Sequence, residues 1–382
     1  MIHRTHIGLF GRRNAGKSSL VNAITGQALS VVSSTPGTTT DPVRKTMELL
    51  PLGPVMVIDT PGFDDEGALG QLRVKKTREI LREVDIAVLV VDCTVGLTGV
   101  DQELIGLFEQ QSTPCLIAAN KCDLAPCEVA YALACSALTG QGIHELKESL
   151  ARLISQKAQP ALLADLINPG DFVVLVTPID ASAPKDRMIL PQVQTIRAVL
   201  DTNAVSVATQ VPELAQVLAT LKTPPALVVT DSQVFKEVAE IVPSHIPLTS
   251  FSILFARYKG FLGAAIESVN ALQNLTPGTN ILIVEGCTHH RQCDDIGAVK
   301  LPRMLGAFSG KRLEFGFSSG GDFPEDLSGF KAVLHCGACM LNDREMQYRR
   351  RCAEDQSVPF TNYGIAIAKT QGILARSVAP LS

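Results

Sequence analysis

Short apolar runs bounded by glycine or polar residues recur along the first part of the chain. They predict buried strands at 6–10, 55–59, 116–120 and 131–135, and a helical run that reaches Ile24. Strands of this length that alternate with helical patterns are typical of a parallel sheet covered by helices. The pattern therefore predicts an α/β domain over residues 1–158.

The rest of the chain repeats this alternation after a linker-like stretch that follows Lys157. Buried strands are predicted at 172–176, 205–208 and 226–229, with helices at 192–200 and 213–221. Two further strands, 280–284 and 331–335, each end just before a segment that contains cysteine. We expect two more α/β domains, at residues 165–270 and 271–382, and a parallel sheet in the first of them.

A glycine-rich loop connects the first predicted strand to the first predicted helix. The segment GRRNAGKS at 11–18 is the P-loop pattern, in the strand–loop–helix context that it requires. Its backbone N–H groups converge on phosphates at the N-terminus of a helix. Lys17 is expected to neutralise the β- and γ-phosphates, and Ser18 is expected to bind Mg²⁺.

Three later strands each end in a segment that can contact the nucleotide. Asp59 and Gly62, in DTPG at 59–62, bring a carboxylate near Mg²⁺ and an N–H group near the γ-phosphate. In NKCD at 120–123, Asp123 can accept hydrogen bonds from guanine N1–H and the N2 amine, which adenine cannot supply. Ser136 and Ala137 can donate from their backbone to guanine O6. Four such segments in order predict GTP rather than ATP.

Cysteine and histidine gather at two places in the last third of the chain. Cys287 and His289 follow one predicted strand, and His335, Cys336 and Cys339 close another. Thiolates and imidazoles at this spacing are ligands of a soft metal centre. The spacing alone leaves zinc and a [4Fe–4S] cluster as equal alternatives. His335 is either a ligand or a residue that orients the Cys-x-x-Cys turn through a hydrogen bond.

Composition and charge indicate the compartment of the protein and the kinds of partner to expect. Ten cysteines and no apolar signal segment before the first strand predict a cytoplasmic protein with reduced thiols. No apolar run reaches the about 18–20 residues that a membrane span needs. A net charge of −4 gives no reason to expect nucleic acid as a partner. The isolated cysteines are interpreted as packing residues: Cys93, Cys115, Cys122, Cys127, Cys135 and Cys352.

Residues 1–155 resemble the tRNA-modification and Era-like (TrmE-like) branch of the translation-factor-type GTPases, through these motifs and the segment PGTTTD at 36–41. The resemblance implies that Thr39 closes over Mg²⁺ in the GTP state. Phe63 stands where many GTPases place a glutamine that orients the attacking water. Asn14 matches the P-loop asparagine that holds K⁺ in potassium-activated members. The other interpretation of Asn14 is a loop residue that tolerates an unusual backbone angle.

The expected cofactors of this domain are GTP, Mg²⁺ and K⁺. Ser18 and Thr39 are the expected Mg²⁺ ligands, and Asn14 is the expected K⁺ ligand. Catalytic roles are expected for Asn14, Lys17, Thr39 and Gly62. The expected nucleotide contacts are Gly11, Asn14, Ala15, Gly16, Lys17, Ser18, Ser19, Thr38, Thr39, Asp59, Gly62, Asn120, Lys121, Asp123, Ser136 and Ala137.

The whole chain, with Cys-x-His and His-Cys-x-x-Cys after the GTPase domain, resembles the [FeFe]-hydrogenase maturation GTPase (HydF) family. The resemblance implies a [4Fe–4S] cluster bound by Cys287, Cys336 and Cys339, with His289 or Asp294 on the fourth iron. It implies three domains: a P-loop GTPase domain, a small parallel α/β dimerisation domain and an α/β iron–sulfur-binding domain. Cys293 is interpreted as a bystander.

Two functions of different class follow. In the first, the protein is a homodimeric, GTP-hydrolysing scaffold that receives a two-iron subcluster made with radical-SAM maturation enzymes and delivers it to apo-[FeFe]-hydrogenase. In the second, it is a zinc-stapled, RNA-associated GTPase of ribosomes or tRNA. The second predicts a basic face. Residues 271–382 hold 12 Lys/Arg against 11 Asp/Glu. Only the arginines at 349–351 form a basic cluster, which on a helix is usually a solvated face, so the scaffold is the favoured prediction.

Overall fold

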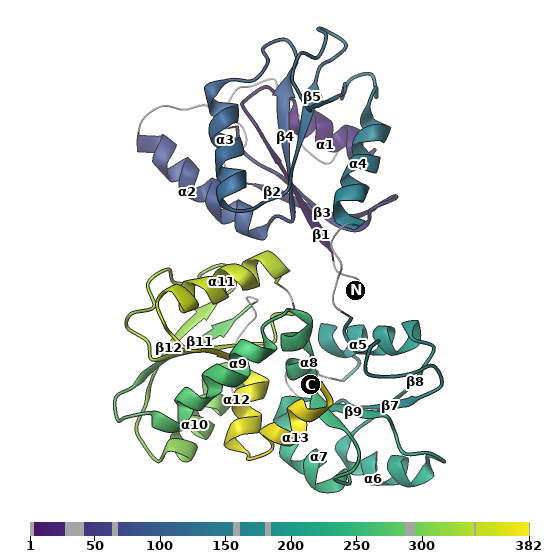
Figure 1. The fold of residues 1–382 in the computed structure, drawn as a ribbon, viewed down its shortest axis with the longest axis vertical. Coiled ribbons are helices and arrows are strands. Elements are labelled where there is room, and N and C mark those ends of the chain that lie inside the picture. The colour runs from purple at the N-terminus through teal and green to yellow at the C-terminus, as the bar shows by residue number, and fades with distance from the viewer. Residues whose placement is uncertain are drawn as a thin grey trace. The chain divides into compact units, whose positions relative to one another are not determined.

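The computed structural model describes residues 4–26, 42–62, 68–155, 161–179, 185–286, 295–339 and 341–381 of the 382-residue chain. The chain divides into two compact units, residues 2–158 and 159–382 (Figure 1). Both units are built from mainly parallel sheets with helices packed on them. The α/β fold class predicted from the sequence is therefore confirmed.

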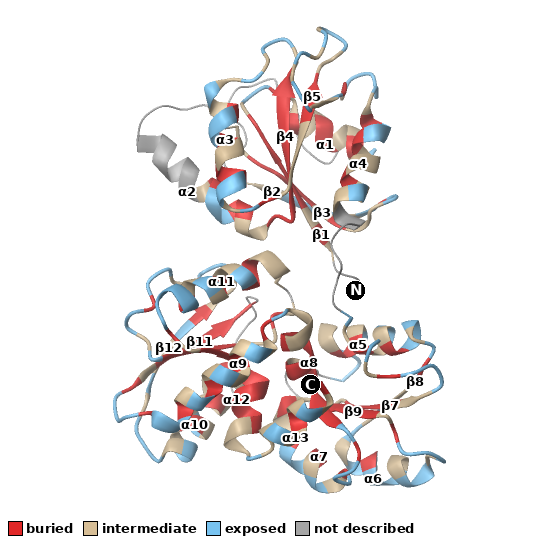
Figure 2. Cartoon of the chain, in the orientation of Figure 1, coloured by how far each residue is buried: buried red, intermediate tan, exposed pale blue. Residues whose placement is uncertain are grey.

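The first unit is built on a six-stranded sheet with the strand order β2-β3-β1-β4-β5-β6. Strand β2 pairs antiparallel with β3, and the other pairs are parallel. Every residue of β4 is buried, because its Ile and Val side chains lie between helices on both faces (Figure 2). The strands are β1 (Thr5–Phe10), β2 (Val43–Leu49), β3 (Gly53–Asp59), β4 (Ile86–Asp92), β5 (Cys115–Asn120) and β6 (Leu133–Ala134).

Each face of this sheet has its own apolar core. Leu20 of α1 and Leu146 of α4 pack in the core on one face. Leu81 of α2 and Phe108 of α3 pack in the core on the other. The helices are α1 (Lys17–Thr25), α2 (Ala68–Glu83), α3 (Gly99–Gln110) and α4 (Ile143–Ser155). The carboxyl ends of β1, β3, β4, β5 and β6 meet at one edge, where an α/β sheet places its ligand.

The second unit contains two four-stranded sheets. The first has the order β10-β9-β7-β8 and is parallel throughout, as predicted. Strand β8 is an edge strand with an exposed Val205, so the prediction that 205–208 is buried was wrong. Its elements are β7 (Phe172–Val176), α5 (Leu190–Asp201), β8 (Val205–Thr209), α6 (Val211–Thr220), β9 (Leu227–Thr230), η1 (Ser232–Val234), α7 (Phe235–Ile241), β10 (Leu248–Ser250) and α8 (Phe251–Tyr258).

The second of these sheets has the order β12-β11-β13-β14 and is also parallel. It places the ends of β11 and β13 side by side, so that the residues after both strands share one edge. Its elements are α9 (Leu262–Ser268), η2 (Val269–Asn274), β11 (Asn280–Glu285), the π-helical turn η3 (Ile296–Lys300), α10 (Leu301–Ser309), β12 (Glu314–Ser319), β13 (Ala332–His335), α11 (Asp343–Asp355), β14 (Phe360–Asn362), α12 (Tyr363–Thr370), α13 (Leu374–Val378) and η4 (Ala379–Leu381).

The two sheets of the second unit share one apolar core that runs from Leu163 to Leu381. Polar contacts also cross between them. Arg376 of α13 donates to the carbonyl oxygens of Ala239 and Val242, at 2.8 and 2.7 Å, and Nδ2 of Asn362 donates to the carbonyl of Ser252 in α8 at 2.9 Å. The division of this unit into domains at residue 270 therefore stays a prediction.

No helix in the described ranges is both long enough and apolar enough to span a membrane. The strands predicted at 6–10, 55–59, 116–120, 172–176, 280–284 and 331–335 are confirmed to within two residues at each end. The strand predicted at 131–135 shortens to Leu133–Ala134.

Candidate functional site

The P-loop, residues 11–18, has a shape that two glycines permit. Gly11 and Gly16 have φ angles of 137° and 89°. A Cβ atom on Gly11 would lie 2.3 Å from the carbonyl oxygen of Val90, and one on Gly16 would lie 2.3 Å from Nδ2 of Asn120. Asn14 has a φ of 61°, the left-handed conformation that asparagine tolerates. The interpretation of Asn14 as a loop residue with an unusual backbone angle is therefore confirmed. Its K⁺ role stays a prediction.

Lys17 begins α1 and lies inside the P-loop. Its Nζ donates to the carbonyl oxygens of Gly11 at 2.9 Å and Arg12 at 2.8 Å. The side chain is 7% exposed. The ammonium group is therefore held in the cradle where phosphates of a nucleotide are expected to lie.

Ser18 and Asp59, which the sequence predicts to lie near Mg²⁺, contact each other directly. The hydroxyl of Ser18 donates to Oδ2 of Asp59 at 2.6 Å. Gly62 lies against the P-loop, because a Cβ atom on it would come 2.8 Å from Cα of Arg13. A hydroxyl and a carboxylate at this distance form the oxygen pair that Mg²⁺ prefers next to phosphates.

Asn120 connects the P-loop to the loop expected at guanine. Its Nδ2 donates to the carbonyl of Ala15, and its Oδ1 accepts from the backbone N–H of Ala137, each at 3.0 Å. Asn120 is 2% exposed. The sequence placed Asn120, Ala15 and Ala137 at the nucleotide, and the structure brings the three together.

Lys121 pairs with Asp92, which closes β4. Their charged groups are 2.5 Å apart. Burial raises the pKa of Asp92, but hydrogen bonds from Lys121 and Thr94 outweigh burial, and the net shift is downward. Asp92 was not among the predicted site residues, and only the parallel register of β4 with β5 brings it to Lys121.

Arg12 is a second residue that the sequence did not single out. Its Nε lies 3.2 Å from Oδ2 of Asp101, a fully buried residue in the first turn of α3. The same carboxylate accepts from the backbone N–H of Thr98 at 3.0 Å and its hydroxyl at 2.8 Å, which is a capping box. The Thr-x-x-Asp pattern at 98–101 predicts the cap, whereas its contact with the P-loop is tertiary.

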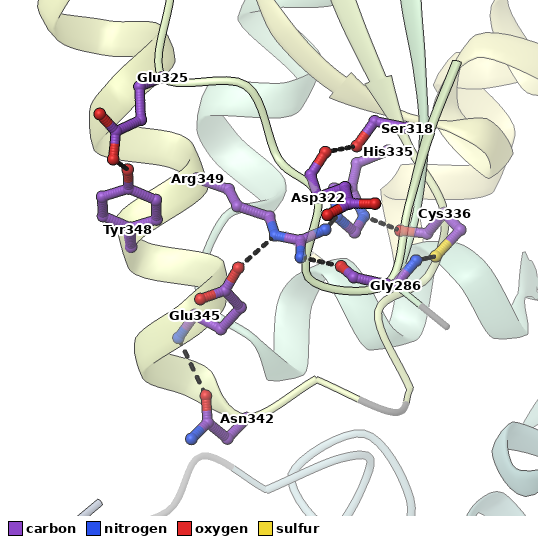
Figure 3. Close-up of polar contacts among 11 residues, drawn as sticks. Gly286, Ser318, Asp322, Glu325, His335, Cys336, Asn342, Glu345, Tyr348 and Arg349 are labelled. Carbon is purple, nitrogen blue, oxygen red and sulfur yellow. Dashed lines mark hydrogen bonds and ion pairs between the residues drawn. The ribbon is translucent and has the colours of Figure 1, made fainter. Parts of the chain in front are cut away.

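In the second unit, the Cys-x-x-Cys turn follows β13. Sγ of Cys336 accepts from the backbone N–H of Gly286 at 3.1 Å (Figure 3) and from that of Ala338 at 3.4 Å. Burial raises the pKa of Cys336, and these two hydrogen bonds act in the opposite direction. Gly286 directly precedes Cys287 in the sequence. The turn is therefore built around a sulfur that receives two N–H donors.

His335 is fully buried, and both of its ring nitrogens have partners. Nδ1 lies 2.9 Å from the carbonyl oxygen of Cys336, which can only accept, so Nδ1 carries the proton. Nε2 accepts from Nη1 of Arg349 at 3.1 Å. Burial and the charge of Arg349 lower the pKa of His335 to about 3, against the hydrogen bond to Cys336. This geometry argues against His335 as a metal ligand and favours its orienting role.

Arg349 of α11 is the largest fully buried side chain of the described residues. Besides His335 it donates to Oε1 of Glu345 at 2.7 Å (Figure 3) and to the carbonyl oxygen of Gly320. Its guanidinium also lies 5.3 Å from the ring centre of Phe323. The sequence placed Arg349 in a basic cluster typical of a solvated helix face, and this interpretation is wrong for Arg349, because it faces inward.

Several predicted site residues lie outside the described part of the chain. They are Thr38, Thr39, Phe63, Cys287, His289, Cys293 and Asp294. Within the described part, no three His, Cys, Asp or Glu side chains are arranged to hold a metal ion. Of the predicted cluster site, the structure therefore describes Cys336 and Cys339, together with His335 directly before their turn.

Comparison with known families separates the two units. The model for the hydrogen maturase F dimerization domain matches residues 162–260, and the model for the hydrogen maturase F tetramerization domain matches residues 263–380. Together these matches cover more than half of the chain. The chain belongs to the hydrogen maturase F family. A third model, the 50S ribosome-binding GTPase, matches residues 6–121. This hydrogen maturase F chain therefore carries a GTPase domain and two oligomerization domains.

Curated relatives resemble the GTPase domain of this hydrogen maturase F chain. The tRNA modification GTPase MnmE of Synechococcus sp. (strain JA-3-3Ab) is 35% identical over 169 residues, which is 42% of this chain and 36% of that protein. GTPase Der of Wolinella succinogenes is 36% identical over 121 residues, 31% of this chain and 26% of that protein. The chain thus spans about a third of the length of the MnmE relative.

Among solved structures, a single-residue variant of Era from Aquifex aeolicus aligns with 53% of this chain and 91% of its own, at 19% identity and a TM-score of 0.36. That likeness is too small to support an argument. The zinc-stapled RNA-associated GTPase is not favoured, because both models that match residues 162–380 are those of hydrogen maturase F.

Proposed function

We propose that this chain is a GTP-hydrolysing scaffold that binds a [4Fe–4S] cluster and carries the two-iron subcluster precursor of [FeFe]-hydrogenase. In this function the protein receives the precursor from radical-SAM maturation enzymes and delivers it to apo-hydrogenase. Membership of the hydrogen maturase F family supports the process, and the turn at Cys336 supports the cluster. The cluster site, the GTPase site and the dimer are each supported by separate observations on the described residues.

The observation that carries the proposal is the environment of the Cys336 sulfur. Two backbone N–H groups, from Gly286 and Ala338, donate to it. Such N–H donors stabilise the negative charge of a cysteine sulfur and are characteristic of iron–sulfur ligands. The donor set also fits: Cys336 and Cys339 lie in one turn, and Cys287 follows the glycine whose N–H reaches Cys336.

In the proposed centre Cys287, Cys336 and Cys339 hold the cluster, and His289 or Asp294 occupies the fourth iron. The cluster would supply an exchangeable iron position to which a second metal fragment can attach. His335 holds the turn in place by donating to the Cys336 carbonyl, and Arg349 keeps the unprotonated nitrogen of His335 occupied. Neither residue needs to touch metal in this arrangement.

The GTPase domain supplies the second part of the function. Lys17 lies in the P-loop cradle, and Ser18 and Asp59 form the oxygen pair for Mg²⁺. We infer that Asn14 holds K⁺ beside the phosphates, with Thr38 and Thr39 closing the site from the first switch. The cation would stabilise charge that develops between the β- and γ-phosphates, the role that a glutamine or an arginine serves elsewhere.

A homodimer through residues 165–270 is the third part. The support is an unpaired sheet edge with apolar side chains around it. Strand β8 ends its sheet. Large apolar residues of this region are exposed by 40–56%: Ile179, Met188, Val193, Leu200 and Val205. Apolar groups at a free edge strand are typical of an interface between chains.

The decisive experiment is metal analysis of the anaerobically reconstituted full-length protein. Iron, sulfide and zinc contents and the electron paramagnetic resonance of the reduced protein are measured for Cys287→Ala, Cys336→Ala, Cys339→Ala, His289→Ala and His335→Ala. Cys352→Ala on α11 serves as the control. Each ligand cysteine variant should lose the four-iron cluster, whereas the control should keep it.

The two histidine variants test the finer assignments. His289→Ala should be milder than the cysteine variants, because a neutral fourth ligand can be replaced. His335→Ala should keep iron but change the spectrum, because the turn loses its anchor. Equal loss of iron in all five variants would contradict the exchangeable iron. A colourless protein that holds zinc would exclude the cluster altogether.

A further inference from the structure

The two four-stranded sheets of the second unit have the same topology and the same register. In each, the first strand along the chain lies between the second and the third, and the fourth lies beyond the third. Thr230 of β9 and His335 of β13 each form the last pair between the third strand and the first. Thr230 therefore holds the place in the first sheet that His335 holds in the second. The second unit is thus one α/β repeat used twice.

The repeat continues into the helix that follows each sheet. Ser250 and Asn362 end the fourth strands and cap the eight-residue helices α8 and α12, each by accepting from the N–H three residues further on. Both helices are followed at the same distance by a left-handed glycine, Gly260 or Gly372, with a φ of 73°. The two helices therefore correspond residue for residue.

Lys259 directly follows α8 and has no charged counterpart, because Gln371 holds the same place after α12. Its side chain is only 5% exposed. Nζ of Lys259 donates to the carbonyl oxygen of Leu341 at 3.0 Å and to Oδ1 of Asp343 at 2.8 Å. Both partners lie shortly after Cys339 in the chain. A buried ammonium group of the first repeat therefore holds the segment that leaves the proposed cluster turn of the second, and this segment satisfies its charge.

The first turn of α8 contacts the cluster turn itself. Gly337, inside the Cys-x-x-Cys turn, packs on Ser252, because a Cβ atom on Gly337 would lie 3.8 Å from Oγ of Ser252. The carbonyl oxygen of Ser252 accepts from Nδ2 of Asn362 at 2.9 Å, which joins this end of α8 to β14. Ser252 and Lys259 lie at opposite ends of α8, about 10 Å apart along its axis. Helix α8 therefore contacts the turn at one end and the segment after it, at Leu341, at the other.

We propose that Lys259 is a positioning residue of the metal site, which fixes the Cys-x-x-Cys turn from the neighbouring repeat without being a ligand. His335 holds the start of the turn by donating to the carbonyl oxygen of Cys336, and Lys259 holds the segment after Cys339. The two anchors together set the positions of the two sulfurs, and contacts that orient ligands also tune the metal. The effect on the cluster rests on the proposed function, whereas the effect on the turn does not.

Alkylation of the metal-free, full-length protein tests the turn by itself. Wild type, Lys259→Met and Lys259→Arg are treated with N-ethylmaleimide for increasing times and cleaved with trypsin. Cys336 and Cys339 are then in the peptide 332–344, and Cys352 is in the peptide 352–369. Lys259→Met should react at least about tenfold faster at Cys336 and Cys339, because losing a hydrogen bond from a charged group shifts a local opening equilibrium by about this factor. Lys259→Arg keeps charged donors and should stay close to wild type.

Two controls separate positioning from a general loss of stability. Cys352 of α11 is half-buried in the same unit and should react at the wild-type rate in every variant. Lys369→Met removes a hydrogen bond to Asn270 on the counterpart helix α12 and should leave all three cysteines unchanged. An equal rise at Cys352 in Lys259→Met would show that the whole unit loosens, and it would overturn the proposal. Unchanged rates at Cys336 and Cys339 would overturn it as well.

The anaerobically reconstituted protein tests the effect on the cluster. Lys259→Met should keep its iron, because every proposed ligand is present, but the electron paramagnetic resonance of the reduced protein should change. Lys259→Arg and Lys369→Met should give the wild-type spectrum. A wild-type spectrum from Lys259→Met would overturn its role at the metal site, even with faster alkylation. A wild-type protein that binds no iron would count against the proposed function instead, and the alkylation rates would still decide whether Lys259 holds the turn.

Discussion

Nη1 of Arg349 donates to Nε2 of His335 at 3.1 Å, and both side chains are fully buried. This hydrogen bond joins α11 to the last residue of β13, directly before the Cys-x-x-Cys turn. It fixes the tautomer of His335, whose other nitrogen holds the carbonyl of Cys336. The buried guanidinium of Arg349 thus holds His335, and His335 holds the proposed cluster turn, although Arg349 itself is not a proposed ligand.

Replacing Arg349 should destabilise the second unit strongly. Arg349→Met removes the donors to His335, Gly320 and Glu345, and leaves the buried carboxylate of Glu345 without its partner. Breaking a buried pair in this way costs about 3–5 kcal/mol. Urea unfolding should report that loss. The exposed Arg351→Met on the same helix should stay within about 0.5 kcal/mol of wild type, and equal stability of the two variants would contradict the buried network.

K⁺ should accelerate GTP hydrolysis, and Na⁺ should not. The cation would sit beside the phosphates next to Asn14, whose left-handed φ of 61° sets its place in the loop. Asn14→Ala should abolish the K⁺ effect while nucleotide affinity stays nearly unchanged. Phosphate release measured in KCl and NaCl decides this, and equal wild-type rates in the two salts would refute the assignment. Asn14→Asp, which keeps an oxygen at this position, should retain part of the acceleration.

The Lys121–Asp92 pair should contribute a stability term that disappears in acid. The folded-state pKa of Asp92 is lowered from 3.8, so its contribution is present above that value and is lost as the pH falls through the folded pKa. The pair is partly exposed, and about 0.2–1 kcal/mol is expected at pH 7.

Lys121→Met checks this in chemical unfolding of the GTPase unit. The variant should be less stable than wild type at neutral pH, and the difference should shrink below about pH 3.8. Arg44→Met, which breaks a pair of the same unit exposed by 41% and 39%, is the control and should change little. A deficit of Lys121→Met that persists unchanged in strong acid would show that its cause is not the charge of Asp92.

A charge on the apolar edge near β8 should weaken the proposed dimer. Leu200 at the end of α5 is 52% exposed, so Leu200→Glu should leave the folded chain intact while opposing burial in an interface. Analytical ultracentrifugation should show the dimer dissociating at a concentration at least about tenfold higher, a change of 1.4 kcal/mol. Leu138→Glu, at an 85% exposed site of the GTPase unit, should not shift it. An unchanged association for Leu200→Glu would place the interface elsewhere.

The sequence by itself determined the features that lie within a few consecutive residues. The P-loop is recognisable because the glycines and lysine that bind phosphate must be adjacent in the chain, and Asn14 and Lys17 lie where that pattern puts them. The apolar strands were predicted closely for the same reason, since a short run of consecutive apolar residues such as Phe172–Val176 is a strong local signal. The Cys-x-x-Cys motif is likewise recognisable from the sequence, because both of its cysteines lie within one turn.

Tertiary structure alone decided what depends on register and on helix facing. The short strands β10 and β14 have three residues each, too few for a period to show. Arg349 lies in a run of three arginines, and only packing of α11 on the sheet turns one of them inward. Asp92 and Lys121 meet because the parallel strands β4 and β5 bring their carboxyl ends to one edge. A local pattern carries no information on which distant residue will lie across that edge, because the free energy of the contact arises only when the whole sheet has formed.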